Sequence, residues 1–404
     1  MENIAYLERC SKKYYDDLVE NILPFWLEYG LDKVHGGFYT CLNRDGSLMD
    51  TTKSVWFQGR AAFTFSYAYN QIQRNPVWLS ASKSAIDFIE KHCFDNDGRM
   101  FFEVSASGIP LRKRRYLFSE SFAAIAMSEY AKASGDYAYA EKALDLFKRI
   151  LYCKNTPGVL TPKYSEHLQM KGHSLSMILI NTASRIRETI EDEVLTRQID
   201  ESIAEIQKDF MKTEFNAVLE TVGLNGEFID TNMGRMINPG HSIETAWFIL
   251  EEAKYRNWDP ELIQTGITIL DWSWEWGWDK EYGGIINFRD CKNLPSQYYA
   301  HDMKFWWPQT EAIIATLYAY EATGNKKYLE MHNMIHNYMY SHFPDDKHGE
   351  WYGYLHRDGT VSQPAKGNLF KGPFHIPRML IKSHVLCKKS VQRNQYTVIS
   401  NNRF

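Results

Sequence analysis

The sequence lacks several patterns that would assign a function at once. It contains no GxGxxG stretch, no P-loop and no GxSxG stretch, so a nicotinamide enzyme, a P-loop nucleotidase and a serine hydrolase have no support. His332 and His336 are four residues apart, but the HNMIH string lacks the Glu that a zinc protease needs after its first histidine. We therefore expect no metal site, and we expect these two histidines to be surface residues.

The sequence also has no large excess of positive or negative charge. The formal net charge is −4, and basic residues are dispersed apart from the short run 112–115, which is typical of a loop. The six cysteines form no CxxC pair, and the start of the chain lacks the apolar core of a signal peptide. We expect a cytoplasmic protein with reduced thiols that binds neither nucleic acid nor membrane.

No linker rich in Pro, Gly or Ser interrupts residues 1–380, and 44% of the 404 residues are hydrophobic. This composition predicts one domain over residues 1–386, followed by a loose polar tail over 387–404. The aromatic content of 15%, with 12 Trp and 25 Tyr, is high. Such rings serve as core or interface material and also fit the faces of sugars, and composition does not choose between these uses.

Short segments that begin near a glycine recur along the chain, and most alternate apolar and polar residues around a turn such as Asp-Gly or Asn-Gly. This pattern is typical of small hairpins. Six segments carry it, the third most weakly: 36–48, 98–111, 157–164, 216–229, 283–295 and 349–361.

An apolar run with helical periodicity follows each of these segments. The runs cover residues 56–69, 119–133, 173–188, 241–252, 307–322 and 374–387. A second amphipathic helix separates each run from the next segment, for example at 137–151, 194–211 and 328–341, and a helix at about 5–29 precedes the first segment.

Six helix pairs that cannot each bury a face alone predict an all-α (α/α)6 barrel, with the hairpins gathered at one end. A helical solenoid is the alternative. In a barrel, the first turns of the inner helices converge on one mouth. Those turns hold eight residues able to act on a ligand: Arg60, Glu120, His173, His241, Glu244, Glu311, His375 and Arg378.

His241 in NPGHSIE and His375 in KGPFHIPR each stand at the start of a predicted helix. The positive end of a helix dipole favours a neutral imidazole, which accepts a proton near pH 7 and returns it as the conjugate acid. A lone histidine at such a place more often caps its helix, but the matched pair favours proton transfer. His173 occupies the equivalent place in the third unit, and we expect either a third sugar contact or a helix-start residue.

Arg60 ends the string WFQGR and can hold an enolate oxygen with parallel hydrogen bonds. The alternative is a buried ion pair with Glu311 or Glu120. Arg378 is expected to be structural or to tune the pKa of His375.

Trp306 and Trp307 precede Pro308, which suits a first helical turn, and we expect the two rings to form a sugar platform. Glu244 and Glu311 could also form the carboxylate pair of a glycoside hydrolase, and their spacing does not exclude it.

Taken together, these motifs resemble the N-acylglucosamine 2-epimerase family. The matching strings are WFQGR at 56–60, RRYLFSESFAAIAMSEYAKASGD at 114–136, NPGHSIETAWFILEEA at 238–253, WWPQTEA at 306–312 and FKGPFHIPR at 370–378. They occur in order and cover nearly the whole chain.

The resemblance implies an (α/α)6 barrel that interconverts N-acetylglucosamine and N-acetylmannosamine without a required cofactor, commonly as a homodimer. It implies that His241 and His375 act as acid and base on opposite faces of C2, that Arg60 holds the oxygen of the opened aldehyde, and that Glu244, Glu311 and the tryptophans orient the sugar.

Relatives in the same superfamily leave alternatives open. They include cellobiose or mannobiose 2-epimerases and aldose–ketose isomerases, and His173 resembles those branches more. A carbohydrate-binding or interaction module on the same toroid is the alternative that is not an enzyme. The resemblance also implies ATP as an activator that is not consumed, although the sequence holds no P-loop for it.

Overall fold

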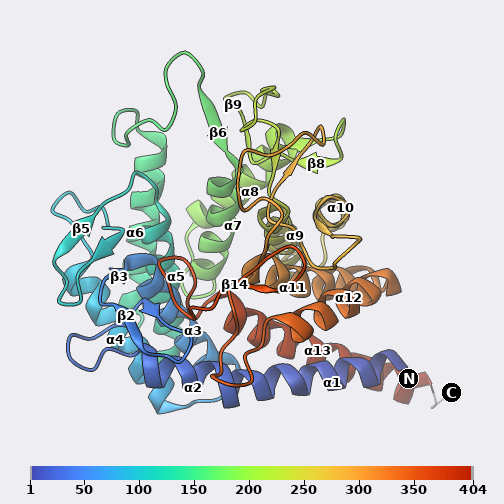
Figure 1. Ribbon diagram of the computed structural model, residues 1–404, viewed down its shortest axis with the longest axis horizontal. Coiled ribbons are helices and arrows are strands. Elements are labelled where there is room, and N and C mark those ends of the chain that lie inside the picture. Colours follow the sequence, from blue (N-terminus) through green and yellow to red (C-terminus); the bar gives the residue numbers. More distant parts are fainter. Residues whose placement is uncertain (1, 402–404) are drawn as a thin grey trace.

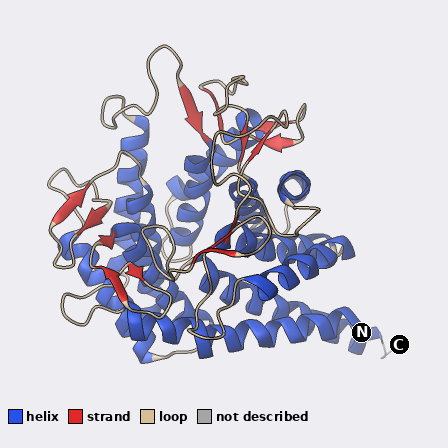
Figure 2. Cartoon of the chain, in the orientation of Figure 1, coloured by secondary structure: helices blue, strands red, loops and turns tan. Residues whose placement is uncertain are grey.

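The computed structural model describes residues 2–401, and its helices form two concentric rings (Figures 1 and 2). The inner ring consists of α3 (Val55–Gln71), α5 (Phe118–Ser134), α7 (His173–Arg187), α9 (Pro239–Tyr255), α11 (Trp306–Thr323) and α13 (His375–Asn401). Each inner helix packs against the next in this order, and α13 packs against α3. The ring is therefore closed, which confirms the (α/α)6 barrel and excludes the solenoid.

The outer ring covers the inner one, because each outer helix buries one face against an inner partner. The first outer segment runs through α1 (Glu2–Asp17), π-helical turns at Leu18–Ile22 and Trp26–Gly30, and α2 (Leu23–Phe25), and it packs on α13. The others are α4 (Pro76–His92), α6 (Ala138–Asn155), α8 (Glu193–Glu205) with a π-helical turn at Ile206–Phe210, α10 (Pro260–Gly277) and α12 (Lys326–His342).

Short antiparallel strands lie at the end of the barrel where the inner helices begin (Figure 2). They are β1 (Cys41–Leu42), β2 (Leu48–Asp50), β3 (Lys53–Ser54), β4 (Glu103–Val104), β5 (Pro110–Arg112), β6 (Met170–Gly172), β7 (Met211–Lys212), β8 (Ala217–Val218), β9 (Thr221–Gly223), β10 (Met236–Ile237), β11 (Arg289–Asp290), β12 (Lys304–Phe305), β13 (Tyr354–Leu355) and β14 (Val361–Gln363).

Three of the six predicted hairpins form as expected: β1 pairs with β2, β4 with β5, and β13 with β14. The prediction of a hairpin is wrong for the other three segments. Residues 157–164 hold no strand. In segment 216–229, β8 pairs with β7 and β9 pairs with β6, and in segment 283–295, β11 pairs with β10. Strand partners that are distant in sequence leave no local turn signal.

Two buried lysines fix the loops at this end of the barrel in the same way. Lys53 Nζ donates to Asp32 Oδ2 at 2.7 Å and to the carbonyls of Gly36 and Ala106. Lys304 Nζ likewise donates to Asp279 Oδ2 at 3.0 Å and to two carbonyls, one in its own unit and one in the next. Because each ammonium is surrounded by three oxygens, a cation is tolerated where water is excluded.

A side chain that bonds to the backbone of the preceding loop recurs in the first turn of three inner helices. Gln58 accepts from the backbone N–H of Phe38 at 2.7 Å and donates to the carbonyl of the same residue at 2.8 Å. Gln309 makes the same pair of bonds with Ile285. In α5 the equivalent residue is Glu120, whose Oε1 accepts from the N–H of Met100 at 3.0 Å. This position therefore ties an inner helix to the preceding loop.

Two sequence expectations about the periphery differ from the structure. His332 is fully buried, since its Nδ1 lies 2.7 Å from Tyr6 Oη and its Nε2 lies 3.0 Å from Tyr14 Oη. The surface location predicted for it is therefore wrong, because tyrosine hydroxyls of α1 satisfy both ring nitrogens. His336 is half-buried beside it and contacts the same Tyr14 hydroxyl.

The last inner helix does not stop at Leu386, where the sequence suggested that a polar tail begins. It continues to Asn401, because Cys387 and Val391 still face the outer segment and are buried. Residues 402–404 of that tail lie outside the described residues. None of the described helices has an apolar stretch long enough to cross a membrane.

Candidate active site

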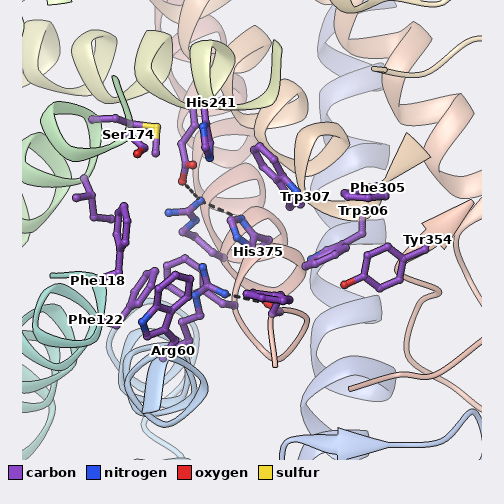
Figure 3. Close-up of a pocket in the computed structure, with 17 residues that line it drawn as sticks. Arg60, Phe118, Phe122, Ser174, His241, Phe305, Trp306, Trp307, Tyr354 and His375 are labelled. Atoms are coloured by element: carbon purple, nitrogen blue, oxygen red, sulfur yellow. Dashed lines mark hydrogen bonds and ion pairs between the residues drawn. The ribbon is translucent and has the colours of Figure 1, made fainter. Parts of the chain in front are cut away.

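A cavity of about 540 Å³ opens at the end of the barrel where the inner helices begin (Figure 3). Its walls are mostly aromatic, and its charged and imidazole side chains come from α3, α9 and α13. The lining residues are Trp56, Arg60, Phe118, Phe122, Ser174, Met177, Ile178, His241, Glu244, Phe305, Trp306, Trp307, Tyr354, Phe370, Phe374, His375 and Arg378. Both predicted histidines and Arg60 are therefore in one pocket.

The position of His241 follows from the way α9 begins. Asn238 caps the helix, and its side-chain oxygen accepts from the backbone N–H of His241 at 3.2 Å. Pro239 then fixes the first turn. As a result, the imidazole stands at the rim of the barrel and points into the cavity rather than into the ring of helices (Figure 3).

A carboxylate from a loop outside α9, that of Glu220, raises the pKa of His241. Its Nδ1 lies 3.0 Å from Glu220 Oε2 and 3.1 Å from Oε1. Burial acts to lower the pKa of His241, but the charge of Glu220 and its hydrogen bond outweigh burial, so that the pKa is raised above its ordinary value of 6.5. This imidazole therefore favours the protonated form, with Nε2 on the side away from Glu220.

His375 is held in the opposite protonation state. Its Nδ1 lies 2.8 Å from Glu311 Oε1, and the Trp247 indole N–H donates to the other oxygen of that carboxylate at 2.8 Å. Burial lowers the pKa of His375 well below 6.5, and the nearby cations Arg378 and Arg60 lower it further. The ring is therefore neutral, with its proton on Nδ1 toward Glu311 and an unprotonated Nε2.

Arg378 joins the two carboxylates behind the histidine. Its Nη2 lies 2.5 Å from Glu244 Oε1 and 2.8 Å from Glu311 Oε1. Glu244, Glu311 and His375 have the geometry of a metal-binding group, with ligand atoms within 4.8 Å of one another. Since the guanidinium already pairs with both carboxylates, a divalent cation at this place would lie against a positive charge.

Arg60 stands at the far side of the pocket from His241 in the view of Figure 3. Its Nη1 donates to the carbonyl of Phe370 at 2.9 Å, and its guanidinium lies 4.2 Å from the centre of the Phe122 ring. Burial lowers its pKa to about 9, so the group remains a cation at neutral pH. The alternative expectation of an ion pair with Glu120 is not met, because Glu120 pairs with Arg99.

The indole of Trp307 lies between the two histidines. Its ring centre is 5.1 Å from that of His241 and 5.9 Å from that of His375. The Trp306 ring meets His375 edge-on at 6.1 Å. Both tryptophans therefore line the predicted site, as the aromatic platform requires.

Three predicted contact residues do not line the pocket: His173, Glu120 and Glu311. His173 is fully buried behind it, where its Nε2 lies 3.0 Å from Thr245 Oγ1, and burial lowers its pKa to about 4. The neighbouring Ser174 lines the cavity instead. Glu120 faces Arg99 and the loop before α5, and Glu311 is fully buried behind His375.

Sequence reasoning missed several residues that the structure brings to the site. Glu220 lies in a loop between strands, 21 residues before His241, and no spacing pattern connects the two. Trp247 is fully buried in the third turn of α9, and its sequence context is that of a core residue. The sequence indicated the aromatic wall of the pocket only through its high aromatic content. This wall includes Trp56, Phe118, Phe122, Tyr354, Phe370 and Phe374.

Comparisons with known proteins identify the family of this chain. A family model described as N-acylglucosamine 2-epimerase matches residues 37–372. N-acylglucosamine 2-epimerase from Rattus norvegicus is 32% identical over 385 residues, which cover 93% of this chain and 91% of the relative. The human protein of the same name is also 32% identical, over 93% of this chain and 88% of its own length.

The fold likewise matches solved structures. Cellobiose 2-epimerase from Spirochaeta thermophila superposes with a TM-score of 0.83 at 21% identity, covering 96% of this chain and 98% of that structure. Because the family model covers most of the chain and full-length relatives share about a third of its residues, the chain belongs to the N-acylglucosamine 2-epimerase family.

Proposed function

We propose that this protein is an N-acyl-D-glucosamine 2-epimerase that interconverts N-acetylglucosamine and N-acetylmannosamine. The observation that carries the proposal is that His241 and His375 line one pocket and are held in opposite protonation states. A pair of groups whose surroundings push their pKa values apart is suited to act as acid and base at the same pH. The names of the most similar relatives support the choice of sugar.

The reaction inverts a carbon next to a carbonyl. In the open-chain sugar, the free Nε2 of neutral His375 takes the proton from C2, and the electron pair moves into the carbonyl to form an enolate. Arg60 stabilises the oxygen that gains charge. Protonated His241 then returns a proton to C2 from the other face, and the carbonyl re-forms. Each general acid or base contributes roughly 10²- to 10⁴-fold.

In the reverse direction the two histidines exchange roles. Each imidazole is oriented by a carboxylate at Nδ1, Glu220 for His241 and Glu311 for His375. This leaves both Nε2 atoms for the substrate, because the hydrogen bonds that the described residues make to these two rings are all at Nδ1.

A glycoside hydrolase on the same barrel has less support. Such an enzyme needs one carboxylic acid that holds a proton and one separate carboxylate. Here Glu244 and Glu311 share the same Arg378 nitrogen. Glu311 also does not line the pocket, so the two carboxylates are not placed to flank a glycosidic bond.

A 2-epimerase of a β-linked disaccharide, or an aldose–ketose isomerase, remains the alternative within enzymes. Cellobiose 2-epimerases are more distant relatives, for example that of Dictyoglomus turgidum at 24% identity over 93% of this chain. The alternative that is not an enzyme, a carbohydrate-binding module, does not require one protonated and one neutral histidine.

The test is incubation with N-acetylmannosamine, cellobiose or mannose in deuterated water, followed by NMR at C2. Deuterium uptake in the N-acetyl sugar alone supports the proposal, and uptake only in cellobiose or mannose favours an alternative. His241→Asn and His375→Asn should each abolish uptake, whereas His348→Asn at a partly buried site in the loop after α12 should not. No uptake in any sugar would support a binding role.

Cofactor, activator, oligomeric state and location are further properties of the enzyme. We propose that the chemistry needs no cofactor, because an arginine is placed to stabilise the enolate and two imidazoles are placed to move the proton. ATP as an activator that is not consumed, a homodimer and a cytoplasmic location are proposed from the family alone. Activity with and without ATP, and the mass of the particle in solution, test the first two.

A further inference from the structure

Tyr354 lines the pocket but has no part in the proton transfer described above. It lies on β13, and its ring meets the Trp306 indole edge-on, with ring centres 5.2 Å apart. Figure 3 shows its hydroxyl turned toward the side of the pocket on which Arg60 stands. Burial raises the pKa of Tyr354 to about 12, so the hydroxyl keeps its proton at neutral pH.

The direction of that proton follows from Asn368. The side-chain Oδ1 of Asn368 accepts from the backbone N–H groups of Phe370 at 2.9 Å and Lys371 at 2.8 Å. Since a backbone N–H only donates, the atom that faces both must be the amide oxygen, and the orientation of the amide is fixed. Both lone pairs of Oδ1 are then in use.

The amide nitrogen of Asn368 therefore faces Tyr354. Its Nδ2 donates to Tyr354 Oη at 3.0 Å, whereas the opposite bond, from the hydroxyl to Oδ1, would span 3.3 Å to an oxygen that is already occupied. The phenol oxygen accepts in this contact. Its own hydrogen is left for a group in the pocket.

The same loop also positions Arg60. The carbonyl of Phe370, two residues after Asn368, accepts from Arg60 Nη1. Asn368 thus orders a short segment that anchors the guanidinium through the backbone and the phenol through its side chain. Tyr354 and Arg60 thus line the same pocket, and burial removes both groups from water.

We propose that Tyr354 donates its hydroxyl hydrogen to the C1 oxygen of the open-chain sugar and shares the enolate charge with Arg60. This assignment rests on the proposed function. No bond to hydrogen breaks in this step: the phenol remains protonated, and its hydrogen bond strengthens as the carbonyl oxygen becomes an enolate oxygen. Tyr354 is then a catalytic residue, and Asn368 is the residue that positions it.

The test uses the wild-type protein, three single variants and one double variant in the C2 deuterium-exchange assay. Tyr354→Phe removes only the hydroxyl, and we expect kcat to fall about 100-fold, as for the loss of one preorganised donor, while KM changes by less than about threefold. Tyr299→Phe, at a fully solvated loop position, is the control and should keep full activity.

Asn368→Asp provides the sharper readout. An aspartate still accepts from the Phe370 and Lys371 N–H groups, but its second oxygen would accept the Tyr354 proton and turn it away from the pocket. We expect a loss of kcat close to that of Tyr354→Phe, and no further loss in the double variant, because both changes remove the same donor. Thermal midpoints near that of the wild type would show that the barrel is intact.

The outcomes separate the two proposals. A wild-type protein without C2 exchange in any sugar overturns the function and this assignment with it. An active wild type with Tyr354→Phe within twofold of it overturns the assignment of Tyr354 alone. Fully additive losses in the double variant would also overturn it, since Asn368 would then act through something other than the phenol.

Discussion

Glu220 Oε2 lies 3.0 Å from Nδ1 of His241, and 4.0 Å from Nδ1 of the buried His173. One carboxylate therefore faces two imidazoles, but only one of them opens to the pocket. Burial and His241 act on the pKa of Glu220 in opposite directions, and the net effect is to lower it, so Glu220 stays ionised at neutral pH. Its negative charge raises the pKa of His241, whereas burial and nearby cations lower that of His375.

Glu220→Gln should therefore move the alkaline limit of activity to lower pH. The carboxylate raises the pKa of His241, so its replacement by a neutral amide lowers that pKa and shortens the range over which the imidazole can act as an acid. The measurement is kcat/KM for C2 exchange as a function of pH. Glu214→Gln, at an exposed position of the neighbouring loop, serves as control and should leave the profile unchanged.

The wild-type profile itself should be bell-shaped around pH 6.5. The pKa of His375 lies below 6.5 and that of His241 above it, so the form with one proton on the pair dominates between them. Activity should fall on the acid side when His375 gains a proton, and on the alkaline side when His241 loses one. A single rising step through pH 6.5 would contradict the assignment of acid and base.

Trp247→Phe should lower kcat about tenfold with little change in KM. The indole N–H donates to Glu311, and without it this buried carboxylate loses a partner at a cost of about 1–3 kcal/mol, which weakens its hold on His375. Trp274→Phe in the outer helix α10 is the matched control for a lost indole. Equal effects of the two variants on kcat would argue against a positioning role for Trp247.

Arg60→Lys should reduce kcat/KM about 100-fold, because an ammonium lacks the planar fork that both binds the Phe370 carbonyl and faces the enolate. Arg74→Lys replaces another arginine stacked on an aromatic ring, 4.9 Å from the centre of Tyr69, which does not line the pocket. That control should retain most of the activity. A pronounced loss there would mean that the substitution harms the fold rather than the chemistry.

Stability should fall as the pH drops below 6.5, in part because of buried histidines outside the catalytic pair. Burial lowers the pKa of His332 to about 3 and that of His336 to about 4. The unfolded chain therefore binds protons below pH 6.5 that the folded chain excludes, and each such histidine costs about 1.5–2 kcal/mol between pH 6.5 and pH 5. Denaturant unfolding of His332→Gln at both pH values should show a smaller difference than the wild type. An equal difference would mean that His332 is protonated in the fold.

The barrel could be predicted because its signal is distributed. Six apolar helical runs of similar length, each with an amphipathic partner, leave few arrangements that bury every apolar face. The strand pairing at the end of the barrel was harder to predict from the sequence. Strands such as β6 and β9, or β10 and β11, pair across long separations, and no turn residue marks such a partnership.

The same distinction explains the site. His241 and His375 were found because a helix start fixes where its side chains point. His173 carries an identical signal at the start of α7, yet its ring turns behind the pocket toward Thr245. That choice depends on the neighbouring helix, which the local sequence does not describe. Glu220 gave no signal at all, since its role exists only through a contact made by folding.

The first-turn position occupied by Gln58, Glu120 and Gln309 has a consequence for how such a barrel acquires new chemistry. Two residues further along, the same helices carry Arg60, Phe122 and Glu311, at or just behind the pocket wall. In these three helices, one position ties the helix to the preceding loop, and the position two residues later holds a cation, an apolar ring or a carboxylate. Because the tie does not involve the second position, the side chain there can differ from helix to helix while the helix start stays fixed.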